Sequence, residues 1–329
     1  MLKQNNEVRE ERASQSFSEM VPSGKHSGTF VTTVLAQGAT TTAHECNRQI
    51  FDGKSRAALP GDIVRSEGDA PTGDENIDRA YDGAGDVYQL YSKQFDRNSL
   101  DGMGMPLRAT VHHRKNYGNA FWNGAQMAYG DGDGQIFKTF TELSVIGHEM
   151  SHGIVQFSGG LIYEGQSGAL NESFADVFGA LTVQHKMGQE AHEADWLIGK
   201  GILASGINGV ALRSMKAPGT AYSDGLLGQD PQPYHWDLFV NTTSDSGGVH
   251  INSGIPNHAF YIFSMYMGGK AWERPGQIWY KALQKINNPM ATFNDWAAET
   301  LDAAIDLHGI GSYEMTMLRR AWKLVGIDV

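Results

Sequence analysis

The sequence has few of the features that mark disulfide-bonded, membrane-spanning or nucleic-acid-binding proteins. It holds one cysteine, Cys46, in 329 residues, so no disulfide can form within the chain. It has no apolar run near the ~20 residues that a transmembrane helix needs. Residues 1–27 lack the apolar core of a secretory signal. Basic residues number 26 against 37 acidic ones, and this net charge of −11 argues against nucleic acid or an anionic membrane as partner.

Glycine, in contrast, is abundant, with 40 residues, and glycine-rich turns separate short β-like runs between residues 48 and 140. Examples of these runs are IVRS (63–66), LRATVHH (107–113) and MAYGDGDG (127–134). They predict an antiparallel, twisted β domain with one helix around residues 76–95. His112 and His113 fall on a predicted strand, where we expect solvated or locally hydrogen-bonded side chains. From residue 141 the apolar spacing becomes helical, as in 272–286 and 293–309, so we expect an α+β fold.

Residues 148–152 read HEMSH, which is the pattern H-E-x-x-H. On a helix, His148 and His152 lie one turn apart on the same face, where two neutral imidazoles can bind one Zn²⁺. Glu149 reaches the open side of the same metal without having to bind it. For these five residues alone, the alternative is a surface helix with two solvated histidines.

A catalytic zinc needs a third protein ligand, and the stretch GALNESFADVFG (168–179) offers one. Glu172 and Asp176 are four residues apart, so they share a helical face. Glu172 is the natural third ligand. Asp176 is placed to accept the spare N–H of one histidine, as zinc-bound histidines usually require. The alternative for Asp176 alone is an aspartate on a helix surface.

Five stretches, in this order, resemble the thermolysin-like neutral metalloproteases: NAFWNGAQMAYGDGDG (119–134), HEMSH, GLIYEGQSGALNESFADVFG (160–179), ALRSM (211–215) and SGGVHINSGI (246–255). The N-terminal runs RQIFDG, LPGDIVRSEGD and RAYDGAGDVY are most similar to the protealysin-type branch. The resemblance begins near Arg48 and implies two domains. Residues 48–157 would be β-rich and end in the HEMSH helix, and residues 158–329 would be helical. The polar residues 1–47 are interpreted as a short pro-segment, although the proline–aromatic motif common there is missing.

The resemblance also implies a metalloendopeptidase with a single catalytic Zn²⁺ bound by the two histidines of HEMSH and by Glu172. Glu149 would be the general base. Tyr163 and His250 would stabilise the oxyanion, and Asp245 would orient His250. From the residues alone, the alternatives are core packing for Tyr163 and a turn histidine for His250. Cys46 is interpreted as a small buried hydrophobe rather than a thiolate that caps the zinc.

Substrate binding follows from the same resemblance. Asn119 and Ala120 match an edge strand that holds a peptide in extended conformation. Arg213 matches the residue that grips a substrate carbonyl bidentately, with a surface ion pair as the alternative. The pocket for the residue after the scissile bond would be lined by Phe137, Val145, Ile198, Ile202 and Leu212. We therefore expect cleavage before bulky hydrophobic residues, although plain core residues would be equally apolar.

One departure from the family concerns calcium. Thermolysin-like enzymes bind a pair of Ca²⁺ ions in an acidic cluster behind the active site. Here Asp195 remains, but Lys200 takes the place of a carboxylate and would repel a cation. Other expected carboxylates, including one from a further calcium loop, are replaced by Ser144, Val183, Leu197 and Val210. We therefore expect no calcium at the usual family sites.

Three other interpretations remain. A catalytically silent zinc protein would be favoured by loss of Glu149, Tyr163 or His250, yet all are present. An aminopeptidase often carries a G-x-M-E-N motif, which the sequence lacks. A zymogen-like state, with residues 1–47 over the cleft, differs from the endopeptidase only in state. We expect a monomer that acts on protein or peptide substrates and is secreted by a route not visible in the sequence, with the cytoplasm as the alternative.

Overall fold

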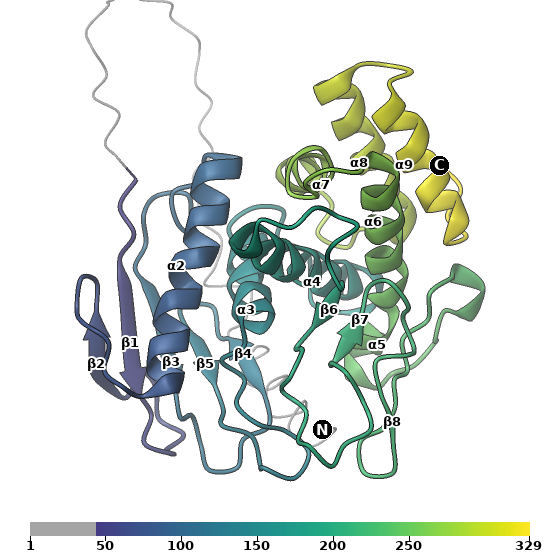
Figure 1. The fold of residues 1–329 in the computed structure, drawn as a ribbon. Coiled ribbons are helices and arrows are strands. Elements are labelled where there is room, and N and C mark those ends of the chain that lie inside the picture. The colour runs from purple at the N-terminus through teal and green to yellow at the C-terminus, as the bar shows by residue number, and fades with distance from the viewer. Residues whose placement is uncertain (1–43) are drawn as a thin grey trace, which may run out of the picture.

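The computed structural model describes residues 44–329, so most of the proposed pro-segment lies outside the described residues. A sheet forms the core of the N-terminal part, and helices build the C-terminal part (Figure 1). The five strands of this sheet are β1 (Arg48–Asp52), β2 (Asp62–Ser66), β3 (Leu107–Val111), β4 (Ala120–Trp122) and β5 (Met127–Tyr129), in the order β2-β1-β3-β5-β4. The expected α+β class is confirmed.

The sheet is mixed, so the prediction of an antiparallel sheet was wrong for its centre. β1 pairs antiparallel with β2, and β4 with β5, whereas β1–β3 and β3–β5 are parallel. β1 and β3 run in the same direction because helix α2 (Glu75–Phe95) lies between β2 and β3 in the chain and returns it to the same end of the sheet. Glycine-rich turns between short runs favour hairpins, but they do not reveal that α2 separates β2 from β3 and so allows a parallel pair at the centre.

Helix α2 confirms the helix predicted around residues 76–95. It begins where the Asp74 carboxylate accepts the backbone N–H groups of Asn76 and Ile77, which is a helix N-cap. It ends at Asp96, whose backbone is left-handed. Gly83 lets α2 approach the next helix closely, since a Cβ there would lie 2.6 Å from Cδ1 of Ile146.

The next two helices, α3 (Leu143–Gln156) and α4 (Gly165–Met187), carry the HEMSH and NESFAD motifs. They touch backbone to backbone at two glycines. A Cβ on Gly147 would lie 2.9 Å from the Cα of Gly179, and a Cβ on Gly179 would lie 2.5 Å from the carbonyl oxygen of Ser144. The two helices lie side by side at the centre of the molecule (Figure 1), and this contact sets how closely the side chains of the two motifs can approach each other.

The remaining elements build two small hairpins and a group of helices. The elements are β6 (Leu197–Ile198), β7 (Arg213–Ser214), β8 (Ser223–Asp224), β9 (Gly228–Gln229), a short 3₁₀ helix (Trp236–Leu238), α5 (Asp245–Asn252), α6 (Gly254–Met267), α7 (Arg274–Lys285), α8 (Phe293–His308) and α9 (Tyr313–Leu324). Stacked indoles of Trp279 and Trp322 join α7 to α9, with ring centroids 5.9 Å apart. The helices predicted within 272–286 and 293–309 are confirmed as α7 and α8. No helix in residues 44–329 is long and apolar enough to cross a membrane.

Candidate active site

The three expected metal ligands meet in one buried group between α3 and α4. His148 and His152 project from α3, and their Nε2 atoms lie 3.0 Å apart. The Glu172 carboxylate of α4 lies 3.4 Å from each Nε2 atom. All three residues are buried, and within residues 44–329 they are the only group of three or more histidine, cysteine or acidic residues placed to hold a metal ion.

The hydrogen bonds on the far side of each ring decide which nitrogens face this group. Nδ1 of His148 donates to Asp176 at 2.8 Å, and Nδ1 of His152 donates to the side-chain oxygen of Asn171 at 2.8 Å. The lone pairs of both Nε2 atoms therefore converge, which is unfavourable unless a cation lies between them. Tetrahedral zinc, with bonds of about 2.0–2.1 Å to nitrogen, separates its ligand atoms by about 3.3–3.4 Å. The observed spacing thus fits Zn²⁺.

The charges around the group also favour a cation. Burial alone would lower the pKa of His148, but the carboxylates of Glu172 and Asp176 raise it to about 9. Burial would raise the pKa of Glu172, but His250, His152 and His148 hold it well below its ordinary value. Carboxylate charge is therefore kept within a water-poor site, where it attracts a positive ion strongly.

Asn171 was missed in the sequence. The only signal for it is the rule that each zinc-bound histidine needs its own acceptor, which leaves His152 without a partner when Asp176 serves His148. Asn171 is fixed in turn, because its Nδ2 donates to the carbonyl of Leu161 at 3.0 Å. Glu149 lies on α3 beside the ligands and is buried, and its charge contributes to raising the pKa of Tyr129 after the larger effect of burial.

The side chains of Tyr163 and His250 lie beside Glu172 of the ligand group. The Tyr163 hydroxyl donates to the Glu172 carboxylate and lies 3.1 Å from Nε2 of His250. Asp245 holds His250 twice, accepting its backbone N–H at 2.9 Å and its Nδ1–H at 2.6 Å. This double grip requires a tight turn at the start of α5, where Ser246 and the following two glycines have positive φ.

Arg213 lies on β7 and binds an internal carboxylate. Its Nε and Nη2 donate to the two oxygens of Asp176 at 2.8 and 2.6 Å, and its side chain is 15 % exposed. Burial would lower its pKa, but the Asp176 charge raises it. The alternative of a surface ion pair is therefore wrong, and one aspartate connects Arg213 to His148.

The expected substrate-binding strand is β4. It forms one end of the sheet, and in residues 44–329 it pairs on one side only, with Ala120 opposite Tyr129. The carbonyl of Asn119, just before β4, accepts the N–H of Gly130 at 3.0 Å. Trp122 ties the strand to the end of the zinc helix, because its Nε1 donates to the Gln156 side chain at 2.8 Å.

The five apolar residues predicted to line the pocket come from three places. Ile198, Ile202 and Leu212 lie around Gly199: a Cβ there would be 2.8 Å from Cγ of Leu212 and 3.1 Å from Cδ1 of Ile202. Leu212 also donates its N–H to the carbonyl of Ile198 at 2.9 Å. The other two pocket residues are Val145, in the first turn of α3, and Phe137, whose segment bridges to Leu203.

In the region expected to lack calcium, side chains of the protein bind one another. Lys200 Nζ lies 2.7 Å from a carboxylate oxygen of Asp195. The Ser144 hydroxyl donates to Glu142 and accepts the N–H of Gly199 at 2.8 Å. Cys46 is half-buried away from the ligand group, beside Arg48 and Glu67, and burial raises the pKa of its thiol to about 11.

Comparison with known families gives two matches that together cover most of the chain. The family described as thermolysin metallopeptidase, catalytic domain, matches residues 24–156. The family described as thermolysin metallopeptidase, alpha-helical domain, matches residues 159–327.

Individual proteins agree with these matches. The extracellular metalloprotease of Pectobacterium carotovorum subsp. carotovorum is 49% identical over 292 residues, which are 87% of this chain and 83% of that protein. Thermolysin of Bacillus caldolyticus is 37% identical, over 84% of this chain and 50% of that protein. A solved structure, the precursor of protealysin from Serratia proteamaculans, superposes with a TM-score of 0.84 at 48% identity and covers 88% of this chain and 90% of that one.

Proposed function

Because the chain belongs to the thermolysin family of metallopeptidases and is a metalloendopeptidase, we propose that it cleaves peptide bonds on the N-terminal side of bulky hydrophobic residues. The observation that carries the hydrolytic part of this proposal is the one buried group of residues 44–329 in which His148, His152 and Glu172 converge, with Glu149 on the same helix as the histidines. The preference for hydrophobic residues is supported by the apolar side chains predicted to line the pocket. Family membership rests on most of the chain, whereas the roles below rest on this geometry.

In the proposed mechanism, His148, His152 and Glu172 would hold Zn²⁺, which when bound would supply polarisation of the substrate carbonyl and a lowered pKa of the attacking water. Glu149 takes the proton of that water and later gives it to the leaving amine. Tyr163 and His250, whose polar atoms are 3.1 Å apart, stabilise the charge on the carbonyl oxygen. Asp245 holds Nδ1 of His250, so Nε2 of that ring stays directed toward the ligand group.

We further propose that the peptide binds in extended conformation along the unpaired edge of β4, at Asn119 and Ala120. Arg213 grips a substrate carbonyl and is itself held by Asp176. The side chain after the scissile bond enters the apolar wall, which consists of Phe137, Val145, Ile198, Ile202 and Leu212. The ion pair of Lys200 with Asp195 supports a site that works without calcium.

The division into residues 48–157 and 158–329 is part of the same proposal and is supported by the end of α3 at Gln156. We propose that the enzyme is a secreted monomer, supported by its similarity to a protein named extracellular metalloprotease. A role of residues 1–47 as a pro-segment is supported by similarity to a protein described as a precursor.

The test is the substitution Glu149→Gln. The amide has the same shape but cannot accept a proton, so we expect peptide turnover to fall by about 10²–10⁴-fold or more, while the zinc content stays at one ion per chain. Glu75→Gln is a matched control, because Glu75 is exposed and pairs with Arg79. Turnover within about tenfold of the parent would show that Glu149 is not the base.

A further inference from the structure

Asn257, on helix α6, donates a hydrogen bond to Asp176, the carboxylate that accepts from the metal ligand His148. It is fully buried, and its Nδ2 donates to Oδ2 of Asp176 at 2.8 Å. Asp176 also accepts from His148 and from Arg213. One buried carboxylate thus joins side chains from four elements: α3, α4, β7 and α6.

The amide of Asn257 can serve this carboxylate only as a donor. The reverse orientation would place its oxygen against Oδ2 of Asp176, and two acceptors at 2.8 Å repel each other. With Nδ2 directed at Asp176, Oδ1 of Asn257 has no hydrogen-bond partner within residues 44–329. A buried carbonyl without a partner is costly, so the bond from Nδ2 is what the side chain contributes at this position.

The two oxygens of Asp176 have different partners, and this gives Asn257 a specific effect. Oδ1 takes Nδ1 of His148 and Nη2 of Arg213, whereas Oδ2 takes Nε of Arg213 and the Asn257 amide. With hydrogen bonds from His148 and Arg213 alone, the plane of the Asp176 carboxylate could rotate together with the Arg213 guanidinium group. A second donor on Oδ2 opposes that rotation, since a carboxylate with two donors on each oxygen has one favourable plane.

We propose that Asn257 is a positioning residue that fixes the plane of the Asp176 carboxylate and, through it, both the His148 ring and the Arg213 fork. Zinc-bound imidazoles depend on the acceptor of their other nitrogen for orientation and basicity. Asn257 therefore supports metal binding and substrate grip together. The proposal rests on zinc binding by the three ligands, but not on Glu149 as base nor on any substrate preference.

The primary measurement is the zinc dissociation constant, obtained by competition with a chelator on chains that carry Glu149→Gln. That background prevents self-digestion and makes the result independent of catalysis. Asn257→Leu keeps the branched shape of the side chain and removes the donor. We expect zinc binding about 10–100-fold weaker, as found for other outer-shell partners. Asn257→Asp, which is nearly isosteric, gives a second variant in case the leucine variant does not fold, and it should weaken zinc binding at least as much by placing a carboxylate against Asp176.

Two controls separate positioning from a general loss of stability. Ser264→Ala alters another buried side chain of α6 whose hydroxyl has no hydrogen-bond partner in residues 44–329. Asn252→Leu removes a buried asparagine that bonds only to the backbone of Val240, at 2.9 Å on each side. Both variants should bind zinc within about threefold of the parent, well below the outer-shell effect. Unchanged zinc binding in Asn257→Leu, or equal weakening in both controls, would overturn the proposal.

A double-substitution cycle tests whether Asn257 acts through Asp176. In a chain that already carries Asp176→Asn, the further change Asn257→Leu should alter the zinc dissociation constant by less than about threefold, because the group to be positioned is gone. Full additivity of the two effects would also overturn the proposal. In the catalytically competent chain, Asn257→Leu should raise KM as well as lower kcat, since Arg213 loses its fixed partner.

Discussion

His112 and His113 are adjacent in the chain, but their surroundings are opposite. Nδ1 of His112 lies 2.9 Å from both carboxylate oxygens of Asp131, and Nε2 lies 3.3 Å from Asp74. The hydrogen bond and the charge of Asp131 raise the pKa of His112 to about 9, against an effect of burial that would lower it. Asp74 and Asp52 add to the rise.

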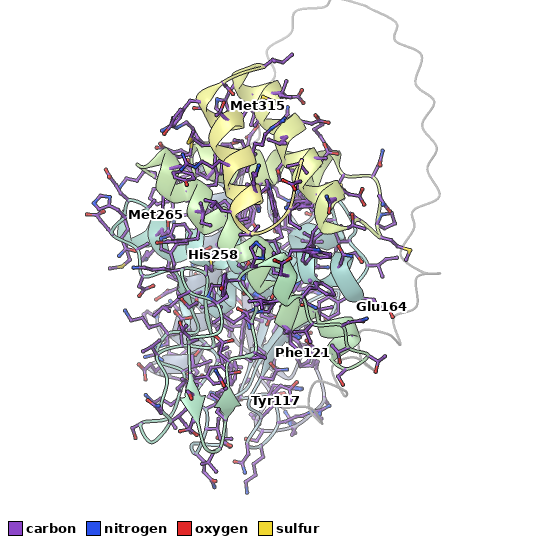
Figure 2. All side chains as sticks on the ribbon, turned by 90° about the vertical axis from the view of Figure 1, so that its right-hand side faces the viewer. Tyr117, Phe121, Glu164, His258, Met265 and Met315 are labelled. Carbon is purple, nitrogen blue, oxygen red and sulfur yellow. The ribbon has the colours of Figure 1, made fainter. Side chains whose placement is uncertain are left out.

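His113 is buried on the other side of the strand end, against the rings of Tyr117 and Phe121, with centroids 5.1 and 5.4 Å away. Figure 2 shows these two aromatic residues in the lower half of the molecule, with Met315 near the top. Neither ring nitrogen of His113 has a hydrogen-bond partner within residues 44–329. Burial, together with the smaller effect of the Arg114 charge, lowers the pKa of His113 to about 4.

The pKa values of about 9 and about 4 each differ by about 2.5 from the ordinary value of 6.5, which corresponds to about 3 kcal/mol. The signs are opposite. The raised pKa of His112 stabilises the fold fully below pH 6.5, and this contribution is lost as the pH rises through about 9. The lowered pKa of His113 costs no stability above pH 6.5, where the ring is neutral in both the folded and the unfolded chain. Below pH 6.5 the unfolded chain takes up the proton first, so stability is lost as the pH falls through about 4.

We therefore expect substitution of His112 to reduce the pH dependence of the unfolding free energy on the alkaline side, and substitution of His113 to reduce it on the acid side. Urea unfolding of chains carrying Glu149→Gln, between about pH 4 and pH 10, gives the free energy of unfolding without self-digestion. His112→Gln should cost about 2–3 kcal/mol near pH 6 and almost nothing near pH 10. With His113→Phe, the free energy of unfolding should decrease by about 2–3 kcal/mol less between about pH 6.5 and pH 4 than it does in the parent. A loss that is equal at every pH for His112→Gln would refute the ion-pair reasoning.

The other predictions concern the substrate, calcium and the N-terminal segment. A peptide series should show graded preference for Leu, Phe, Ile or Val after the scissile bond, since one methylene in such a pocket is worth only ~1–3 kcal/mol; dominance of charged residues there would contradict the apolar wall. Millimolar Ca²⁺ should not raise the melting midpoint beyond the effect of Mg²⁺, because Lys200 neutralises Asp195; a bound ion at 100-fold excess over its Kd would add about 2.7 kcal/mol. With Glu149→Ala in both, the full chain should bind a peptide inhibitor more weakly than a chain that begins near Ala43, and equal binding would show that residues 1–47 do not cover the cleft.

The metal ligands could be predicted because their spacing translates directly into geometry. In H-E-x-x-H the helix itself places both imidazoles on one side, and E-x-x-x-D does the same for Glu172 and Asp176. Asn171 and Asn257 could not be predicted in this way, because each one's partner belongs to another element. Arg213 is an intermediate case: its presence could be predicted, but its bond to Asp176 depends on how β7 packs against α4.

His112 and His113 show the same limit of prediction from the sequence in the β domain. Both were expected to be solvated or locally bonded. His112 is hydrogen-bonded, but to Asp131 and Asp74, which are distant in the sequence, and the ring of His113 is packed among aromatic residues. Both residues were also predicted to lie on a strand, which is wrong, because β3 ends at Val111 and the backbone of His112 is left-handed. What surrounds each ring depends on Asp131 and Phe121, which come later in the chain. The strand directions at the centre of the sheet were predicted wrongly for a related reason, because they depend on the connection through α2 and not on the residues of the strands.

The metal site depends as much on two glycines as on its ligands. His148 and Glu172 lie on different helices, so the distance between their donor atoms is set by how closely α3 and α4 approach. Gly147 and Gly179 set that approach: a Cβ on Gly179 would lie 2.5 Å from the Ser144 carbonyl oxygen, which is backbone and has no rotamer to change. The helices would have to separate by several tenths of an ångström, whereas metal–ligand distances are held within about 0.2 Å. The ligand motifs therefore form a zinc site only because small residues allow the backbones beside them to touch.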